Sequence, residues 1–211
     1  MKAAVRGLYA VTPDIADTAE LAAKVEAALV GGAALVQYRN KTADPELRLV
    51  QAGTLRALCQ ARGVPLVIND DVDVATALDA DGLHLGKEDS MLSEARARLG
   101  PEKLLGASCY DRLEDAVAAV RAGADYVAFG SFFASVVKPG AVRAPLTLLR
   151  EARQGLGVPT VAIGGITLDN ASQLIAAGAD AVAVISALFS ASDIRVAAER
   201  FNELFKTTLR T

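Results

Sequence analysis

The sequence has no tryptophan, and only 5% of its 211 residues are aromatic. A core built mainly from alanine, valine and leucine suits helices packed against a buried parallel sheet. The chain also has one histidine and two cysteines, Cys59 and Cys109, which lie far apart and form no C-x-x-C pair. We therefore expect two buried free thiols, and neither a zinc site nor a disulfide.

A strong charge of one sign and long apolar runs are also lacking. The 22 basic and 25 acidic residues give a net charge of −3, so no nucleic-acid partner is expected. No stretch approaches the roughly 18 apolar residues of a membrane-spanning helix, and the apolar run near the N-terminus is too short for a signal peptide. These absences predict a soluble cytoplasmic protein that does not bind membranes.

Short apolar segments alternate regularly with amphipathic ones along the whole chain. The predicted strands cover residues 7–11, 33–38, 65–68, 82–85, 104–109, 126–130, 160–163 and 181–186. The predicted helices cover residues 18–30, 45–62, 72–80, 92–99, 113–122, 145–156, 169–177 and 194–205. In the helix over 45–62 we expect an apolar face that includes Leu47, Leu49, Val50, Leu55 and Leu58.

Eight strands alternating with eight helices predict an α/β protein, a single (β/α)8 TIM-barrel domain over residues 1–211. A weak internal repeat supports this: Ala-Gly-Ala-Asp occurs at 122–125 and again at 177–180, each time before a strand. The alternative, an open doubly wound sheet, needs a glycine-rich loop after the first strand. The segment after that strand, TPDIAD at 12–17, contains no glycine.

Acidic residues follow two neighbouring strands. Asn69, Asp70 and Asp71 come directly after the strand over 65–68, and Asp89 follows the strand over 82–85. In barrels of this kind, ligands bind at the carboxyl ends of the strands. Two carboxylates converging there, Asp70 and Asp89, would suit Mg²⁺, which is held by few carboxylates together with substrate phosphates. The alternative is that these aspartates only cap the helices that follow.

A polar segment ends the second strand. Gln37, Arg39 and Lys41 alternate, so they share one face of an extended chain. Long polar side chains at the end of a buried strand need a partner, and an anionic ligand such as a phosphate supplies one. The alternative partners are neighbouring acids, for example Asp70.

Other strand ends offer further polar groups. Ser108 ends the fifth strand, and the long loop over 131–144 carries Lys138 and resembles a lid. Gly164-Gly165 and Ser186 end the last two strands, where barrels often bind a phosphate through backbone N–H groups. The alternative for Gly164-Gly165 is a tight turn.

Two anion sites in one mouth follow from this arrangement. Arg39, Lys41 and Lys138 with Mg²⁺ suit a diphosphate, whereas the glycine and serine site suits a monophosphate. The sequence places no cysteine or histidine as an evident nucleophile. For the single histidine, His84, we expect a structural or supporting role. A metal and cations without a base point to diphosphate departing as a leaving group.

Several motifs together resemble the thiamine phosphate synthase family. They are QYRNK at 37–41, VINDDVDVATALDADGLHLGKED at 67–89, GAS at 106–108, GADYVAFGSFFAS at 123–135, AIGGITLDN at 162–170 and GADAVAVISAL at 178–188. The resemblance implies a Mg²⁺-dependent (β/α)8 enzyme with two small phosphorylated substrates. Such an enzyme joins hydroxymethylpyrimidine diphosphate to thiazole phosphate through a carbocation-type step and releases diphosphate. It also suggests a homodimer.

The resemblance also implies roles for individual residues. Asp70 and Asp89 would ligate Mg²⁺, and the catalytic set would be Arg39, Lys41, Ser108 and Lys138. The pyrimidine diphosphate would be held by Gln37, Arg39, Lys41, Asn69, Ser108 and Lys138. The thiazole phosphate would be held by Ser135, Val136, Val137, Gly165, Ile185 and Ser186.

One segment departs from the family pattern. The lid of the family usually reads Pro-Thr-x-Thr-Lys, whereas residues 134–138 here read Ala-Ser-Val-Val-Lys. Ser135 retains a hydroxyl and Val137 does not, so at residue 137 we expect either a backbone contact to the thiazole phosphate or a weaker KM for that substrate. The alternatives are a thiazole tautomerase-like paralogue and a non-catalytic regulator that binds a thiamine-related phosphate. The complete set of charged residues argues against both. A phosphosugar epimerase would need several metal-binding histidines.

Overall fold

The computed structural model describes residues 4–86, 92–134 and 142–208. Its eight parallel strands form a closed barrel in sequence order, in which β1 pairs with both β2 and β8. The strands are β1 (Gly7–Val11), β2 (Leu35–Tyr38), β3 (Leu66–Asn69), β4 (Gly82–Leu85), β5 (Leu104–Tyr110), β6 (Tyr126–Phe129), β7 (Thr160–Ile163) and β8 (Ala181–Val184). The predicted (β/α)8 barrel is therefore confirmed.

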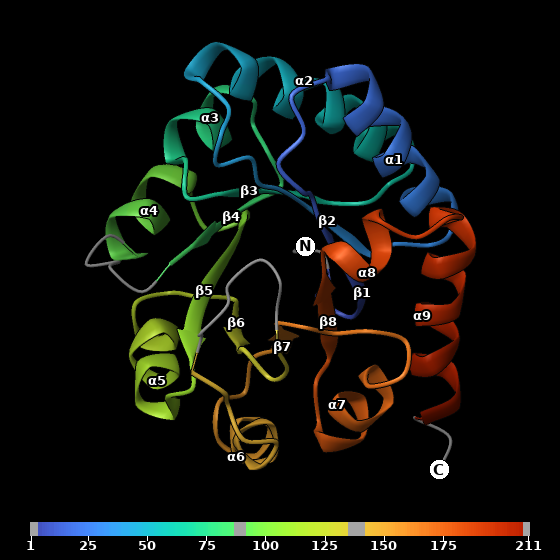
Figure 1. Cartoon of the computed structure of the whole chain (residues 1–211). Coiled ribbons are helices and arrows are strands. Elements are labelled where there is room, and N and C mark those ends of the chain that lie inside the picture. Colours follow the sequence, from blue (N-terminus) through green and yellow to red (C-terminus); the bar gives the residue numbers. More distant parts are fainter. Residues whose placement is uncertain (1–3, 87–91, 135–141, 209–211) are drawn as a thin grey trace.

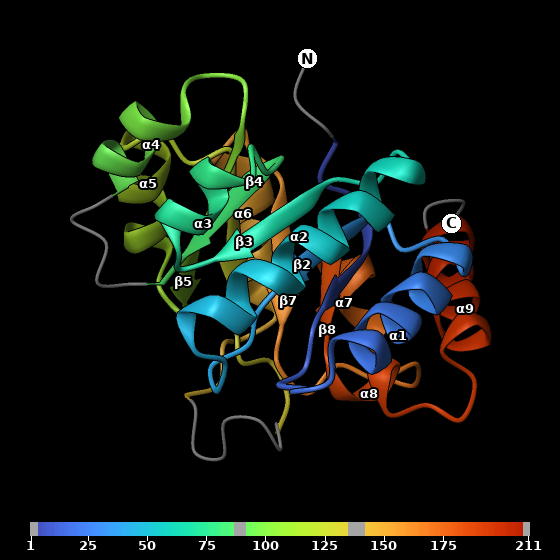
Figure 2. The same ribbon diagram turned by 90° about the horizontal axis from the view of Figure 1, so that it is seen from above.

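Helices surround the strands on the outside of the barrel, as Figures 1 and 2 show. They are α1 (Thr18–Val30), α2 (Pro45–Ala61), α3 (Val72–Ala77), α4 (Leu92–Leu99), α5 (Leu113–Arg121), α6 (Thr147–Gly155), α7 (Ala171–Ala177), α8 (Ser186–Phe189) and α9 (Ile194–Thr208). The last helix, α9, packs against α1 and α7 and so covers the seam where β8 meets β1. Among the described residues, no helix combines the length and apolarity needed to cross a bilayer.

Side-chain alternation divides the apolar residues into two clusters. In β1, Leu8 and Ala10 point outwards to the helices, whereas Tyr9 and Val11 point into the barrel. Barrel-facing positions on β6 and β8 carry small residues, Ala128 and Ala183, which also line a cavity. The choice of alanine there leaves room inside the barrel for a ligand.

The repeated Asp residues close the amino end of the barrel. Asp125 Oδ2 accepts from the backbone N–H of Leu105 at 2.9 Å, and Asp180 Oδ2 accepts from that of Thr160 at 2.8 Å. Each carboxylate thus accepts a hydrogen bond from a backbone N–H group at the start of the neighbouring strand. The repeat stabilises the end of the barrel opposite to the one where barrels carry their active sites.

Several expectations were wrong in detail, and three of them bear on the site or the packing. The last strand stops at Val184, and Ser186 begins a short additional helix, α8, that the sequence had not indicated. The helix expected from residue 145 begins at Thr147. On α2, Leu49 and Val50 are exposed, while Gln51 is fully buried and accepts a hydrogen bond from Tyr38 Oη at 2.9 Å. Apolar periodicity missed this because a buried polar network, and not apolar packing alone, fixes how α2 faces the sheet.

Candidate active site

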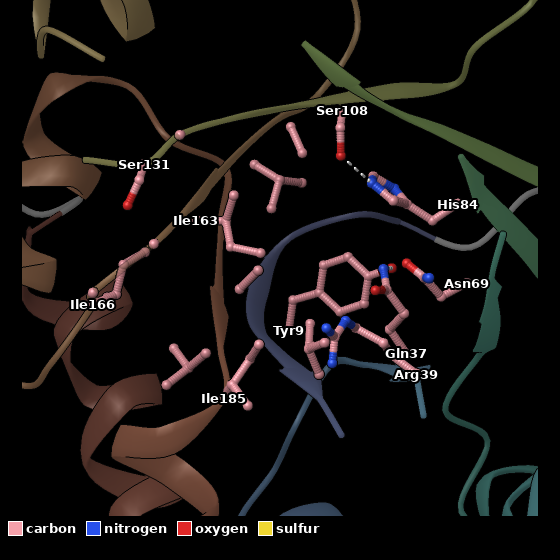
Figure 3. A pocket seen from close by; sticks show the side chains of 18 of the residues that line it. Tyr9, Gln37, Arg39, Asn69, His84, Ser108, Ser131, Ile163, Ile166 and Ile185 are labelled. Atoms are coloured by element: carbon pink, nitrogen blue, oxygen red, sulfur yellow. Dashed lines mark hydrogen bonds between the residues drawn. The ribbon is translucent and has the colours of Figure 1, made fainter. Parts of the chain in front are cut away.

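A cavity of about 360 Å³ lies at the carboxyl end of the barrel. Its wall differs from side to side: Figure 3 shows Gln37, Arg39 and Asn69 on one side, with Ile163 and Ile185 across from them. The predicted site residues that line it are Gln37, Arg39, Lys41, Asn69, Asp70, Ser108, Gly165, Ile185 and Ser186. Ser135, Val136, Val137, Lys138 and Asp89 lie outside the described residues.

The polar residues at the end of the second strand lie as their alternation predicted. Gln37, Arg39 and Lys41 all line the cavity. The Arg39 guanidinium pairs with Asp14 at 3.1 Å, so its acidic partner is Asp14 and not Asp70. The same carboxylate accepts from the backbone N–H of Lys41 at 2.8 Å. Asp14 therefore holds the segment over 39–41 in place, a role that no sequence pattern had indicated.

Asp70 and Asp71 have different tasks. Asp71 caps α3 by accepting from the backbone N–H of Val74 at 3.0 Å, and it pairs with Arg48 at 2.9 Å. Asp70 lines the cavity with a left-handed backbone, at φ 60°, which aspartate and asparagine adopt more readily than most residues. Of these two neighbouring aspartates, Asp71 is the helix cap.

A neighbouring side chain holds the carboxylate of Asp70. Asn69 Nδ2 donates to Asp70 Oδ2 at 2.7 Å, which fixes the carboxylate. The other oxygen, Oδ1, faces Gly86, where an added Cβ would lie 3.9 Å from it. Gly86 follows β4 and precedes the segment that contains Asp89. Within the described ranges, no group of three or more His, Cys, Asp or Glu side chains is arranged around a metal position.

The opposite wall is shaped by backbone. Gly165 has φ 64°, and a Cβ there would collide with the backbone of Phe133 and Ala134. Asn170 braces this turn, since its Nδ2 donates to the Gly165 carbonyl at 3.0 Å and its Oδ1 accepts from Thr167 N at 2.8 Å. The exposed Ser186 lies close by, at the start of α8.

Four functional candidates were missed or left undecided by the sequence. Tyr9, Ser131 and Thr167 line the cavity, and so does His84, whose direction the strand pattern had left open. His84 Nε2 lies 2.9 Å from Ser108 Oγ, the contact dashed in Figure 3. The sequence did offer a signal for Tyr9, which lies in the middle of a buried strand. A buried tyrosine hydroxyl needs a hydrogen-bond partner, so other polar side chains should lie near it.

Burial lowers the pKa of His84 to about 4, although nearby Asp70 opposes the shift. The unfolded chain binds a proton at this residue near pH 6.5, so we expect stability to fall as the pH drops from about 6.5 to 4. The loss should approach about 3 kcal/mol. Urea unfolding with EDTA at pH 7 and pH 4.5 measures it. His84→Asn should show a smaller pH dependence than the wild type, and equal dependence in both would refute the assignment.

Comparison with known proteins identifies the family. Residues 8–188 match the sequence model of a family described as thiamine monophosphate synthase. The chain belongs to this family. It is 58% identical to a thiamine-phosphate synthase of Azoarcus sp. (strain BH72) over 95% of this chain and 98% of that protein. A second thiamine-phosphate synthase, from Methylobacillus flagellatus, is 55% identical over 95% and 96% of the two chains.

A solved structure extends the agreement to three dimensions. The thiamine phosphate pyrophosphorylase from Pyrococcus furiosus superposes with a TM-score of 0.85, at 36% identity and 96% coverage of both chains. The resemblance noted from the motifs is thus confirmed at the level of the family. Family members are transferases, and a cavity at the carboxyl end of the barrel is where such a fold places its chemistry.

Proposed function

We propose that this protein condenses hydroxymethylpyrimidine diphosphate with thiazole phosphate to give thiamine phosphate and diphosphate. The observation that carries the proposal is the two-sided cavity. Two cations, Arg39 and Lys41, and the carboxylate of Asp70 lie on one side, and the backbone turn at Gly165 lies on the other with Ser186. One volume can thus hold two phosphorylated molecules side by side.

The reaction needs charge stabilisation more than proton transfer. The bond between the pyrimidine methylene carbon and the diphosphate oxygen breaks, and its electron pair leaves with the diphosphate. The thiazole nitrogen then donates its lone pair to the methylene carbon, so no proton has to be removed. Arg39 and Lys41 hold the diphosphate, and the Ser108 hydroxyl donates to it. The two cations that line the described part of the cavity, Arg39 and Lys41, suit this dissociative sequence, in which no proton has to be moved.

Mg²⁺ completes the proposed charge balance. Bound by Asp70 and Asp89, it would supply positive charge to the departing diphosphate. Asn69 fixes the carboxylate of Asp70 through the 2.7 Å hydrogen bond, so that the ligand is oriented before the substrate arrives. A cytoplasmic location and a homodimer remain predictions from the sequence and the family.

Omitting one substrate separates this proposal from the tautomerase-like alternative. A synthase consumes thiazole phosphate only when the pyrimidine diphosphate is present, in equal amounts. A tautomerase interconverts thiazole phosphate tautomers alone. We expect no change in thiazole phosphate until the second substrate is added. Conversion of the thiazole phosphate alone, at a rate unaffected by the pyrimidine, would favour the tautomerase. Binding without conversion under either condition would favour the regulator.

The lid residue Val137 offers a test of the thiazole phosphate site. Val137→Thr restores the hydroxyl usual in the family, and one hydrogen bond to a charged phosphate should lower KM for thiazole phosphate about tenfold. Val142→Thr is the matched control, since Val142 lies in the same loop and is 68% exposed. Steady-state kinetics with thiazole phosphate varied measures both. An unchanged KM in Val137→Thr would remove residue 137 from the site.

A further inference from the structure

A continuous chain of hydrogen bonds runs across the floor of the cavity. Gln37 Nε2 donates to Tyr9 Oη at 2.9 Å, and Tyr9 Oη lies 2.8 Å from Tyr126 Oη. Tyr126 Oη lies 3.1 Å from His84 Nδ1, and His84 Nε2 lies 2.9 Å from Ser108 Oγ. The five side chains come from five strands, β2, β1, β6, β4 and β5. The hydrogen bonds thus connect Gln37 on β2 to Ser108 on β5 through side chains of three other strands.

The direction of the protons along this chain is fixed at its first link. Because Gln37 Nε2 can only donate, Tyr9 Oη accepts there and gives its single proton to Tyr126 Oη. Tyr126 in turn donates to His84 Nδ1. A neutral imidazole that accepts at Nδ1 carries its proton on Nε2, so His84 donates to Ser108 Oγ. The proton of Ser108 is then free to point into the cavity.

The surroundings of the chain hold it in this arrangement. Tyr9 and Tyr126 are 1% and 0% exposed, so a hydroxyl without a partner would be costly at either position. The rings of His84 and Tyr126 stack, with centroids 5.6 Å apart. Gly106 makes the room for them, because a Cβ at this position would overlap the Tyr126 ring and lie 2.6 Å from His84 Nδ1.

We propose that Tyr126 is a positioning residue that sets the tautomer of His84 and so makes Ser108 a hydrogen-bond donor to the anionic group of the substrate. Tyr126 does not itself line the described cavity, and it acts only through His84 and Ser108. In the opposite arrangement His84 would carry its proton on Nδ1, and Ser108 would donate its proton to Nε2. The lone pairs of Ser108 would then face the same anion and repel it. This inference rests on the proposed function for the identity of the anion, but the polarity of the relay can be tested without it.

The protein has a single histidine, so the tautomer of His84 can be measured directly. In protein with ¹⁵N-labelled histidine and no histidine tag, a long-range ¹H–¹⁵N correlation spectrum contains one imidazole, that of His84. We expect the Nε2–H tautomer in the ligand-free wild type at pH 7. Tyr126→Phe removes the donor to Nδ1, so the spectrum should shift towards a mixture of tautomers. A wild-type spectrum of the Nδ1–H tautomer would overturn the proposal, whatever the enzyme's activity.

Tyr38→Phe is the matched control for the spectrum. Tyr38 is 1% exposed, and its hydroxyl bonds Gln51 at 2.9 Å outside the relay. Tyr38→Phe also removes one tyrosine hydroxyl oxygen from a buried position, so the tautomer of His84 in this variant should equal that of the wild type. An equal shift in Tyr38→Phe and Tyr126→Phe would mean that general loosening, and not the relay, moves the proton.

Kinetics test whether Tyr126 acts through Ser108. Tyr126→Phe and Ser108→Ala should each lower kcat about tenfold, the effect of one lost hydrogen bond in the transition state. The double variant should also be about tenfold slower and not a hundredfold, because both changes remove the same donor. Multiplying effects would contradict the relay. If the wild type forms no thiamine phosphate, the proposed function fails, and the spectrum still decides the polarity.

Discussion

Replacing Asp70 by asparagine should lower turnover by about 10²–10³-fold while leaving the free energy of unfolding almost unchanged. The loss follows from removing a negative charge at the position proposed for Mg²⁺. Stability should survive because asparagine tolerates the left-handed backbone, φ 60°, that Asp70 adopts. Steady-state rates at saturating substrates and urea unfolding measure the two quantities on the same preparation.

The neighbouring aspartate is the control, with the opposite expected profile. Asp71→Ala removes the cap of α3 and the ion pair with Arg48, so it should cost about 1–2 kcal/mol of stability. Its turnover should stay within about threefold of the wild type, because Asp71 is engaged outside the cavity. If both variants lost turnover equally, position 70 would have no special role and the metal assignment would fall.

Replacing Arg39 by methionine should lower kcat/KM for the pyrimidine diphosphate about a hundredfold. A guanidinium can bind two phosphate oxygens at once, and methionine keeps much of the length without charge or donors. The Asp14 carboxylate would also lose its partner at 3.1 Å, which adds a repulsive charge near the diphosphate. Initial rates with the pyrimidine diphosphate varied provide the measurement.

Arg62→Met controls for the loss of an ion pair as such. Arg62 pairs with Glu26 at the same distance, 3.1 Å, on the exposed surface. Exposed pairs contribute little, so both stability and kcat/KM should stay near the wild-type values. An Arg39→Met enzyme that is as active as Arg62→Met would show that the diphosphate is held elsewhere, and Lys41 would be the next residue to replace.

The sequence predicted those parts of the site that depend on position within a single strand. Strand alternation placed Gln37, Arg39 and Lys41 on one face, and the structure brings all three to the cavity. The end of β3 likewise predicted Asp70 at the mouth. These inferences hold because a parallel barrel exposes its strand ends in one place, so that position along a strand determines position in the site.

Contacts between distant strands were not visible. Tyr9 and Tyr126 are 117 residues apart, and nothing in either strand indicates that their hydroxyls meet at 2.8 Å. The same is true of Asp14, which becomes the partner of Arg39 only when β1 and β2 lie side by side. The burial of Gln51 and the exposure of Leu49 also escaped prediction, because hydrophobic periodicity cannot register a polar side chain satisfied inside the core.

Product formation by the purified protein tests the proposed synthase activity directly. It should be given hydroxymethylpyrimidine diphosphate and thiazole phosphate, first with Mg²⁺ and then with excess EDTA. We predict thiamine phosphate and diphosphate in equal amounts with Mg²⁺, and a rate that falls to near zero in EDTA and returns when Mg²⁺ is restored. Absence of thiamine phosphate from a folded, Mg²⁺-supplied protein would contradict the proposed function, and a rate indifferent to EDTA would contradict the role of Mg²⁺.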